Sequence, residues 1–270
     1  MVSTGSIVVM IINAILGIVL PVFLAWWAVK KHQARLSTIL IGAATFIVFA
    51  LVLEALVHQV VLKGPRGAAI QENVLWYALY GGLMAGLFEE TGRFLSMKFL
   101  LKKEPSTTLP GVAYGLGHGG MEMLILFGVS MLSTLAMAMM VNTGQTEMLM
   151  GKAPAEAQGQ LAAQLEQMKT ATPGLYLIGL WERFSALILQ VSLSILVWVA
   201  VRKGGKWLWL YPAAILLHAL VDGLAVILSK NAGMVTVELV VMALAVAVAA
   251  LAWLVARKAQ LFHCKASGSL

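Results

Sequence analysis

Carboxylates, histidines and an arginine recur at a spacing of four residues within long apolar stretches of this sequence. The pairs are Glu89 with Arg93, His118 with Glu122, and His218 with Asp222. Residues at positions i and i+4 of a helix lie on one face, one turn apart. A carboxylate beside a histidine can take a proton from water, and further polar groups can stabilise the oxyanion that forms at an attacked carbonyl. The pattern therefore predicts acid–base chemistry on the faces of three helices.

The apolar stretches also hold an unusual number of other ionisable side chains. Well inside them lie six acids, two arginines and three histidines: Glu54, Glu89, Glu90, Glu122, Glu182, Asp222, Arg93, Arg183, His58, His118 and His218. An ionised group in mid-bilayer costs about 2.5–3.5 kcal/mol on insertion scales, so such groups face a bundle interior and usually have a function. Six acids exceed two arginines by four charges. Some of the acids therefore share protons, or a cation lies among them.

Counting residues along the helices places three of these side chains at one depth. Glu89 lies nine residues from Lys98, His118 nine from Leu109 and His218 nine from Trp209, and these three residues mark the predicted cytoplasmic ends of their helices. At 1.5 Å per residue, that depth is roughly 14 Å. We therefore predict an inner site of Glu89, Glu90, His118, Glu122, His218 and Asp222. We interpret Arg93 as a structural partner that neutralises Glu89 or Glu90, and predict a structural outer set of Glu54, His58, Glu182 and Arg183.

The elements that position these residues are predicted to be membrane-spanning helices. The chain is 60% hydrophobic and 11% charged with a mean hydropathy of +0.89, and a soluble fold of 270 residues could not cover that apolar surface. A helix that spans a bilayer needs about 20 apolar residues. The sequence predicts an all-α, polytopic transmembrane bundle in one domain, 1–270. Its spans, about seven, are predicted over 5–29, 37–62, 73–100, 110–141, 174–201, 207–229 and 233–256.

The connections between the predicted spans differ in charge. Basic residues concentrate after the first, third, fifth and seventh spans, as at Lys30 and Lys31. Cytoplasmic connections carry such an excess, so we predict an external N-terminus and a cytoplasmic C-terminus. The external segment 142–172 is predicted to form a short amphipathic helix or, equally, a solvated linker. Cys264 is the only cysteine, which excludes a disulfide framework and indicates a free thiol in the C-terminal tail.

Two mechanisms of hydrolysis fit the inner site. In the first, Glu89 is the base, His118 is its partner, and His218 and Asp222 polarise the carbonyl. In the second, Zn²⁺ is bound by His118, His218 and one carboxylate, Glu89 or Glu122, which leaves a position open for water. The small residues around His118, including Gly117 and Gly119, allow close helix packing and would leave room for an extended backbone or a water molecule. The residues alone leave both mechanisms open.

Four motifs follow one another in order: Phe88-Glu89-Glu90-Thr91-Gly92-Arg93, Gly117-His118-Gly119-Gly120-Met121-Glu122, Glu182-Arg183 and His218-Ala219-Leu220-Val221-Asp222. Over about residues 74–228 the chain resembles the YhfC family of intramembrane proteases. That family is similar in motif order to the glutamic-type CAAX-processing and bacteriocin-processing membrane proteases. The resemblance implies that Glu89 or Glu90 activates water together with His118, while His218 and Asp222 bind the oxyanion or complete the site.

The chain departs from these patterns at two places. Its Glu-Glu-x-x-Arg motif is one residue shorter than the Glu-Glu-x-x-x-Arg of the CAAX-type enzymes, which leaves open whether Glu89 or Glu90 faces the site. Gln190 stands where relatives often carry a histidine, which argues against a metal site with four protein ligands.

The sequence therefore predicts an intramembrane protease, a multi-pass protein of the bacterial plasma membrane. Its expected partners are membrane lipid and a peptide or membrane-protein substrate, and its possible cofactor is Zn²⁺. A proton- or cation-coupled transporter is the alternative, because the same carboxylates could carry protons or an ion, although no inverted repeat is evident. A non-catalytic scaffold or a receptor for a small ligand is a third class. We expect no nucleic-acid partner, because the basic residues lie between apolar runs.

Overall fold

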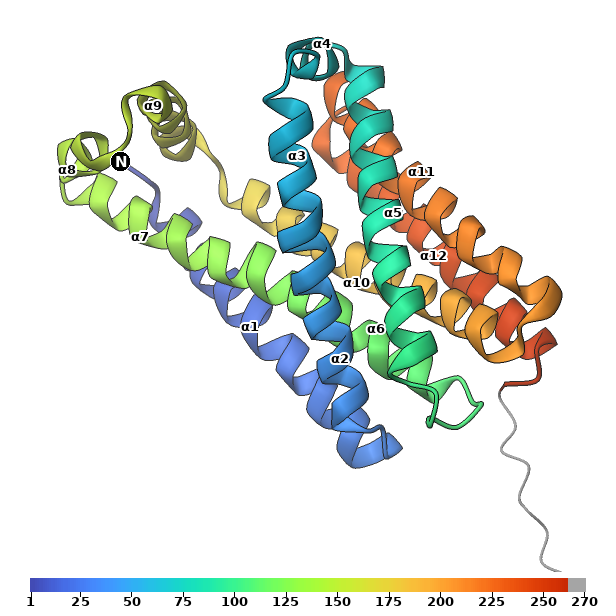
Figure 1. Cartoon of the computed structure of the whole chain (residues 1–270). Helices are drawn as coiled ribbons and strands as arrows, with labels where there is room; N and C mark the ends of the chain where they lie inside the picture. The colour runs from blue at the N-terminus through green and yellow to red at the C-terminus, as the bar shows by residue number, and fades with distance from the viewer. Residues whose placement is uncertain (262–270) are drawn as a thin grey trace, which may run out of the picture. The chain divides into compact units, whose positions relative to one another are not determined.

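The computed structural model describes residues 1–261, and every regular element in that range is a helix (Figure 1). The α-helices are α1 (Thr4–His32), α2 (Leu36–Phe46), α3 (Ala55–Leu62), α4 (Gly67–Glu72), α5 (Val74–Phe99), α6 (Leu109–Glu122), α7 (Ser130–Asn142), α8 (Thr146–Lys152), α9 (Ala155–Thr170), α10 (Pro173–Lys203), α11 (Leu210–Asn231) and α12 (Met234–Lys258). Two π-helical segments, η1 (Ile47–Glu54) and η2 (Met123–Val129), and the 3₁₀ segment η3 (Gly205–Trp209) join some of them end to end.

Within the described range, six helical stretches are long and apolar enough to cross a membrane. They are Thr4–His32, Leu36–Leu62, Leu109–Asn142, Pro173–Lys203, Gly205–Asn231 and Met234–Lys258. The remaining predicted span, 73–100, forms α5, which has the length but carries Glu89, Glu90 and Arg93. The predicted all-α, polytopic membrane protein is confirmed. The side of the membrane on which each terminus lies stays a prediction, and Cys264 lies outside the described residues.

Local sequence signals set the ends of two helices that carry the site. Asn73 has an extended backbone, and its Oδ1 accepts hydrogen bonds from the amides of Leu75 (3.0 Å) and Trp76 (3.1 Å). This N-cap satisfies two of the amides that the start of α5 leaves without helical partners. Beyond the end of α10, Gly204 and Gly205 adopt φ of 62° and 53°, a left-handed conformation that glycine tolerates and that stops the helix.

The chain divides into two compact units. Unit 1 comprises Met1–Leu20 and Met123–Arg183, and unit 2 comprises Pro21–Glu122 and the chain from Phe184 onward. Every residue of the predicted inner site belongs to unit 2. The single domain predicted from the sequence stays a prediction.

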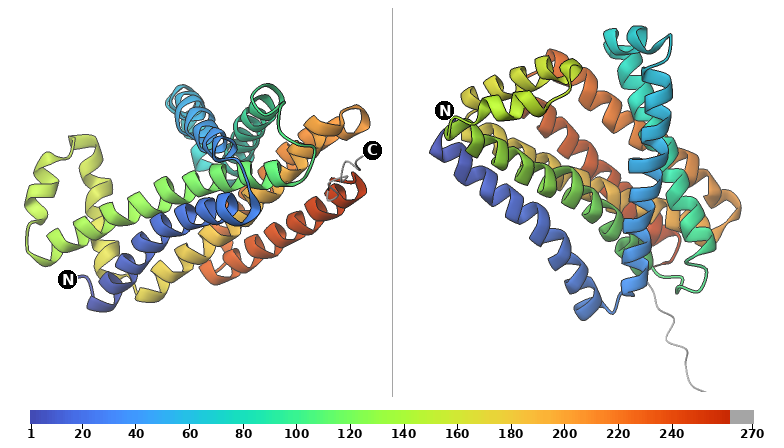
Figure 2. Two further views of the ribbon diagram at one scale, coloured as in Figure 1. Left: turned by 90° about the horizontal axis from the view of Figure 1, so that it is seen from below. Right: turned by 60° about the vertical axis from the view of Figure 1, so that its left-hand side comes forward.

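Unit 1 contains the segment that was predicted to be an amphipathic helix or a linker. Figure 2 shows α8 and α9 as the short helices that follow α7. The apolar face of α9 is buried, since Leu165 and Met168 belong to a core that also includes Met10 of α1 and Val141 of α7. The segment is therefore helical, and its apolar face packs against other helices of unit 1.

Unit 2 is held together by helix crossings at which glycines allow two backbones to touch. α5 packs along α11, and α2 packs along α6. A Cβ atom added at Gly86 of α5 would lie 2.6 Å from the carbonyl oxygen of Ile215, and one at Gly117 of α6 would collide with the carbonyl oxygen of Ile39. A Cβ at Gly119 would lie 2.8 Å from the Cβ of Gln190 on α10. The space beside these glycines is therefore filled by neighbouring helices, which brings the polar faces of α5, α6, α10 and α11 together.

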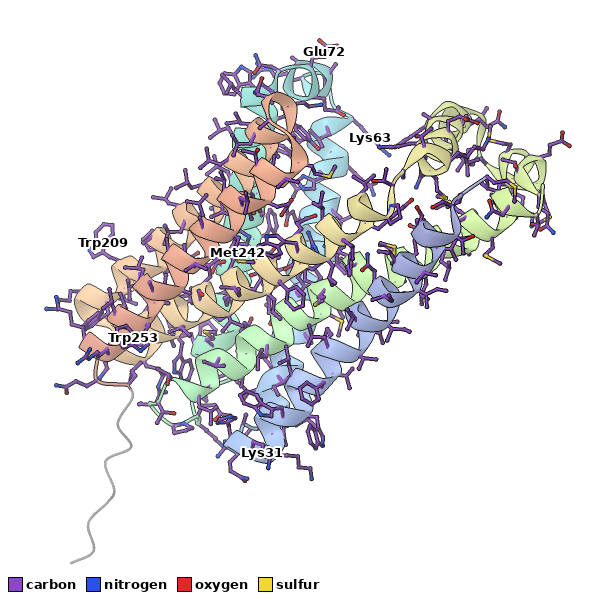
Figure 3. All side chains as sticks on the ribbon, turned by 180° about the vertical axis from the view of Figure 1, so that it is seen from behind. Lys31, Lys63, Glu72, Trp209, Met242 and Trp253 are labelled. Atoms are coloured by element: carbon purple, nitrogen blue, oxygen red, sulfur yellow. The ribbon has the colours of Figure 1, made fainter. Side chains whose placement is uncertain are left out.

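The two ends of unit 2 carry polar and aromatic side chains. In Figure 3, Glu72 and Lys63 lie toward the top of the view, and Lys31 lies at the bottom. Lys31 is at the end of α1, and Lys63 follows α3, so the helical stretch Leu36–Leu62 separates the two. This separation agrees with the predicted placement of the two lysines on opposite sides of a membrane.

Candidate active site

Four helices of unit 2 contribute the side chains of the predicted inner site. Glu89, Glu90 and Arg93 lie on α5, His118 and Glu122 on α6, Gln190 on α10, and His218 and Asp222 on α11. The residues form two carboxylate–histidine pairs that share one arginine. Each pair joins two helices, so the predicted convergence of α5, α6 and α11 is present.

The first pair is formed by Glu89 and His118. Nε2 of His118 lies 2.8 Å from Oε2 of Glu89, and the imidazole is fully buried. The edge of Phe46 and the stacked ring of Tyr114 hold the imidazole, with centroids 5.3 and 6.1 Å away. Nδ1 of His118 is buried and has no hydrogen-bond partner among the described residues. An unpaired buried donor is costly, so this arrangement favours the neutral tautomer whose Nε2–H donates to Glu89.

The second pair is formed by Glu90 and His218. Nδ1 of His218 lies 2.9 Å from Oε1 of Glu90, and its Nε2 lies 3.5 Å from Oδ2 of Asp222. Glu90 is fully buried and His218 nearly so, whereas the side chain of Asp222 is 40% exposed. The second pair is therefore enclosed by protein except where Asp222 extends from it.

Arg93 connects the two pairs. One guanidinium nitrogen donates to both oxygens of Glu90, at 2.9 and 3.2 Å. The other nitrogen donates to Oε1 of Gln190 and lies 3.6 Å from Oε2 of Glu89. Arg93 has no exposed surface, and burial of such a cation requires partners of opposite charge. The structure thus places Arg93 against both glutamates.

The geometry distinguishes Glu89 from Glu90. Both oxygens of Glu90 accept hydrogen bonds from Arg93, and its Oε1 also faces His218, in a position with no exposed surface. Glu89 is 7% exposed, and the hydrogen bonds from His118 and Gln190 both reach its Oε2. Oε1 of Glu89 has no hydrogen-bond partner within residues 1–261 and is not fully buried. Of the two glutamates, Glu89 is therefore the one with a carboxylate oxygen that no described residue contacts by a hydrogen bond.

Gln190 is the part of the site that sequence reasoning missed. Its Nε2 donates to Oε2 of Glu89 at 2.9 Å and to Oε2 of Glu122 at 2.7 Å, and its Oε1 accepts from Arg93. The amide thus binds three charged residues from two helices. The position of Gln190 in the sequence could have indicated this role. A glutamine in the middle of the apolar helix α10 needs polar partners when it is buried.

The predicted outer residues form contacts of their own. Glu182 and Arg183 form an ion pair with each other in unit 1. Glu54 and His58 of unit 2 contact each other and Tyr80. Glu238 of α12 is a further buried acid that the count from the sequence left out.

The side chains do not match the zinc site that the sequence left open. Among the described residues, no three His, Cys, Asp or Glu side chains converge to hold a metal ion. The 2.8 Å between Nε2 of His118 and Oε2 of Glu89 is a hydrogen-bond distance, whereas two ligands of tetrahedral zinc with bonds of about 2.0 Å lie about 3.3 Å apart. The Arg93 guanidinium, 3.6 Å from Oε2 of Glu89 and 2.9 Å from Oε1 of Glu90, already supplies a positive charge to these two carboxylates. As the donors lie, they form a hydrogen-bonded network and not a metal centre.

Comparison with known proteins covers nearly the whole chain. A family model described as YhfC intramembrane metalloprotease matches residues 16–257, a range that includes every residue of the two pairs. A Bacillus subtilis (strain 168) protein described as uncharacterized membrane protein YhfC is 36% identical over 233 residues, which is 86% of this chain and 88% of that protein. No solved structure matches the chain significantly.

Proposed function

The chain belongs to the YhfC intramembrane metalloprotease family, and from that premise we propose that it hydrolyses a peptide bond with a water molecule activated by Glu89. The substrate is a membrane-embedded or membrane-associated polypeptide. The observation that carries the proposal is the geometry of Glu89, whose Oε2 is held by His118 and Gln190 while Oε1 is left for a water molecule. A positioned base of this kind contributes about 10²–10⁴-fold to a rate.

Glu89 acts first as a base and then as an acid. Its carboxylate takes one proton from the water molecule as the water oxygen bonds to the carbonyl carbon of the substrate. The protonated Glu89 then gives this proton to the amide nitrogen as the carbon–nitrogen bond breaks, which yields a carboxylic acid and an amine. His118 donates through Nε2–H to Glu89 and fixes the direction of its free oxygen.

His218 and Asp222 complete the site in this proposal. Nδ1 of His218 is engaged by Glu90, and its Nε2 points toward Asp222 at a distance too long for a strong hydrogen bond. Because Glu90 accepts from Nδ1–H, a proton on Nε2 makes the ring an imidazolium, and this cation can donate its Nε2–H to the oxyanion of the tetrahedral intermediate. Loss of one such donor in other hydrolases costs about 10²–10³ in kcat.

The test uses purified full-length protein in lipid vesicles and a library of peptides and membrane proteins. We expect cleavage by the wild type and a loss of about 10²–10⁴-fold in kcat for Glu89→Gln and His118→Ala. Glu238→Gln is the matched control, since it neutralises a buried acid of the same unit on α12. Cleavage that persists in both site variants would remove this site from consideration.

Two further measurements separate the alternatives. Metal bound to the active protein in a 1:1 ratio, together with loss of activity on chelation, would contradict water activation by Glu89 alone. Proton-coupled uptake by the vesicles that is lost in the same variants, without cleavage of any substrate, would favour the transporter.

A further inference from the structure

A second polar cluster in unit 2 is not used by the proposed chemistry. His58 of α3 lies between two partners, with Nε2 3.1 Å from Oε1 of Glu54 and Nδ1 2.8 Å from the hydroxyl of Tyr80 on α5. Glu54 is the last residue of the π-helical segment η1, and such segments are frequent at functional sites. In turn, the segment η1 that ends at Glu54 packs against α5, the helix that carries Glu89. The cluster is therefore connected with the candidate active site.

The exposure of two of these side chains indicates what they face. The side chain of Asp222 is 40% exposed and that of His58 is 34% exposed, although both lie inside helices of predicted spans. Ionisable groups at such positions face a bundle interior or a water-filled cavity, because contact with lipid is costly. Their exposed surface thus indicates water.

The side chains lie at successive depths along α5. At 1.5 Å per residue, Tyr80 lies about 9 Å and Glu89 about 22 Å from the first residue of this helix. His58 contacts Tyr80, and Asp222 lies near the same level, because the backbones of Ala219 and Gly223 meet Gly82. Glu54 lies one helical turn from His58, on the side away from the end of α3. The side chains thus lead inward from the end near α4 to the base of the candidate active site.

We propose that Glu54, His58, Tyr80 and Asp222 line a water-filled passage that leads from the α4 end of unit 2 to Glu89. Each hydrolysis consumes one water molecule, and the reacting groups are enclosed by apolar helices. Carboxylate, imidazole and hydroxyl groups offer donors and acceptors in succession, which stabilises a file of water molecules at this depth. The delivery of substrate water rests on the proposed function, whereas the existence of the passage does not.

The passage itself is tested by the reactivity of single cysteines in full-length protein in vesicles. In a Cys264→Ser background, His58→Cys and Tyr80→Cys are treated with a charged, membrane-impermeant thiosulfonate from each side separately. Leu56→Cys is the matched control, because Leu56 is 55% exposed on the same helix between Glu54 and His58. We expect the two passage cysteines to react at least 10-fold faster than the control from one side. Equal rates for all three would overturn the proposal.

The delivery of water is tested by two substitutions of Glu54, one that keeps a polar side chain and one that replaces it with an apolar side chain. Glu54→Gln keeps a polar lining, and we expect kcat within about 3-fold of the wild type. Glu54→Leu blocks the passage, and we expect a loss of at least 10-fold in kcat with KM unchanged. Equal losses in both variants, or loss in neither, would contradict delivery. Unfolding midpoints of both variants verify the fold, and the cysteine measurements decide the passage even if no proteolysis is found.

Discussion

Arg93 is a fixed positive charge in a position with no exposed surface. Its guanidinium binds Glu90 through one nitrogen and faces Glu89 and Gln190 through the other. A buried charge of this kind is tolerated only with partners, and removal of one partner typically costs 3–5 kcal/mol. The planar fork of an arginine suits two acceptors on different helices, which a lysine would not reproduce. The residue thus orients both glutamates.

Gln190 positions Glu89 through its side-chain amide, which donates a hydrogen bond to Oε2 of Glu89. We expect Gln190→Leu to remove the amide hydrogen bonds to Glu89 and Glu122 and to lower kcat at least 10-fold. Each lost hydrogen bond to a buried charged group is worth about 1.5–3 kcal/mol, so the free energy of unfolding should fall as well. The measurements are peptide hydrolysis and the unfolding midpoint in detergent.

Gln167→Leu is the matched control, because Gln167 lies on the exposed face of α9. The same substitution there should leave both quantities unchanged. If Gln190→Leu retained the kcat of the wild type, a positioning role for this amide would be contradicted.

The sequence predicted a cluster of these side chains but not how they pair within it. Residue counting placed Glu89, His118 and His218 at one depth, since helical rise is regular and charges mark helix ends. The sequence could not show which glutamate contacts which histidine. An i,i+4 spacing shows that two residues share a face of one helix, but it does not show which other helix packs against that face. Gln190 escaped for a related reason, as an uncharged amide adds little to a count of ionisable groups.

At the scale of the elements, the helix ends were predictable because hydropathy and basic residues mark them. The span predicted over 37–62 is Leu36–Leu62, and the one predicted over 73–100 is α5, Val74–Phe99. The π-helical segments η1 and η2 were not predicted, since a local shift from i+4 to i+5 hydrogen bonds leaves the apolar pattern almost intact. An amphipathic helix was one of two equal predictions for 142–172, and the sequence could not choose between them because the packing of α9 depends on tertiary contacts.

The crossing of α5 and α11 provides a matched pair of glycines. We expect Gly82→Ala to destabilise the protein, because its Cβ would collide with the carbonyl oxygen of Ala219. At Gly81, the preceding residue, no atom lies within 4 Å of an added Cβ, so Gly81→Ala should be neutral or should stabilise by up to about 1 kcal/mol through helix propensity. Thermal unfolding of both variants in one detergent measures the difference. Equal midpoints would contradict a close backbone crossing.

At the scale of the whole molecule, the arrangement of charges predicts the orientation in the membrane. Lys30 and Lys31 end α1, and the positive-inside rule assigns that end to the cytoplasm. We expect a cysteine at Lys31 to react with an impermeant reagent only in inside-out vesicles, and one at Lys63 only in right-side-out vesicles. The Cys264→Ser protein without added cysteines is the control. The reverse pattern would invert the predicted orientation.

The glycine crossings also restrict how a polypeptide reaches Glu89. An extended chain needs about 4.7–4.9 Å beside its neighbour merely to form hydrogen bonds. Between α5 and α11, where an added methyl group at Gly86 would lie 2.6 Å from a backbone oxygen, no chain can slide through without parting the helices. No polypeptide can therefore pass between these two helices, and in the proposed reaction a substrate must approach Glu89 between other helices. The backbone packing of α5 and α11 thus restricts the direction from which a substrate can approach, whatever its side chains are.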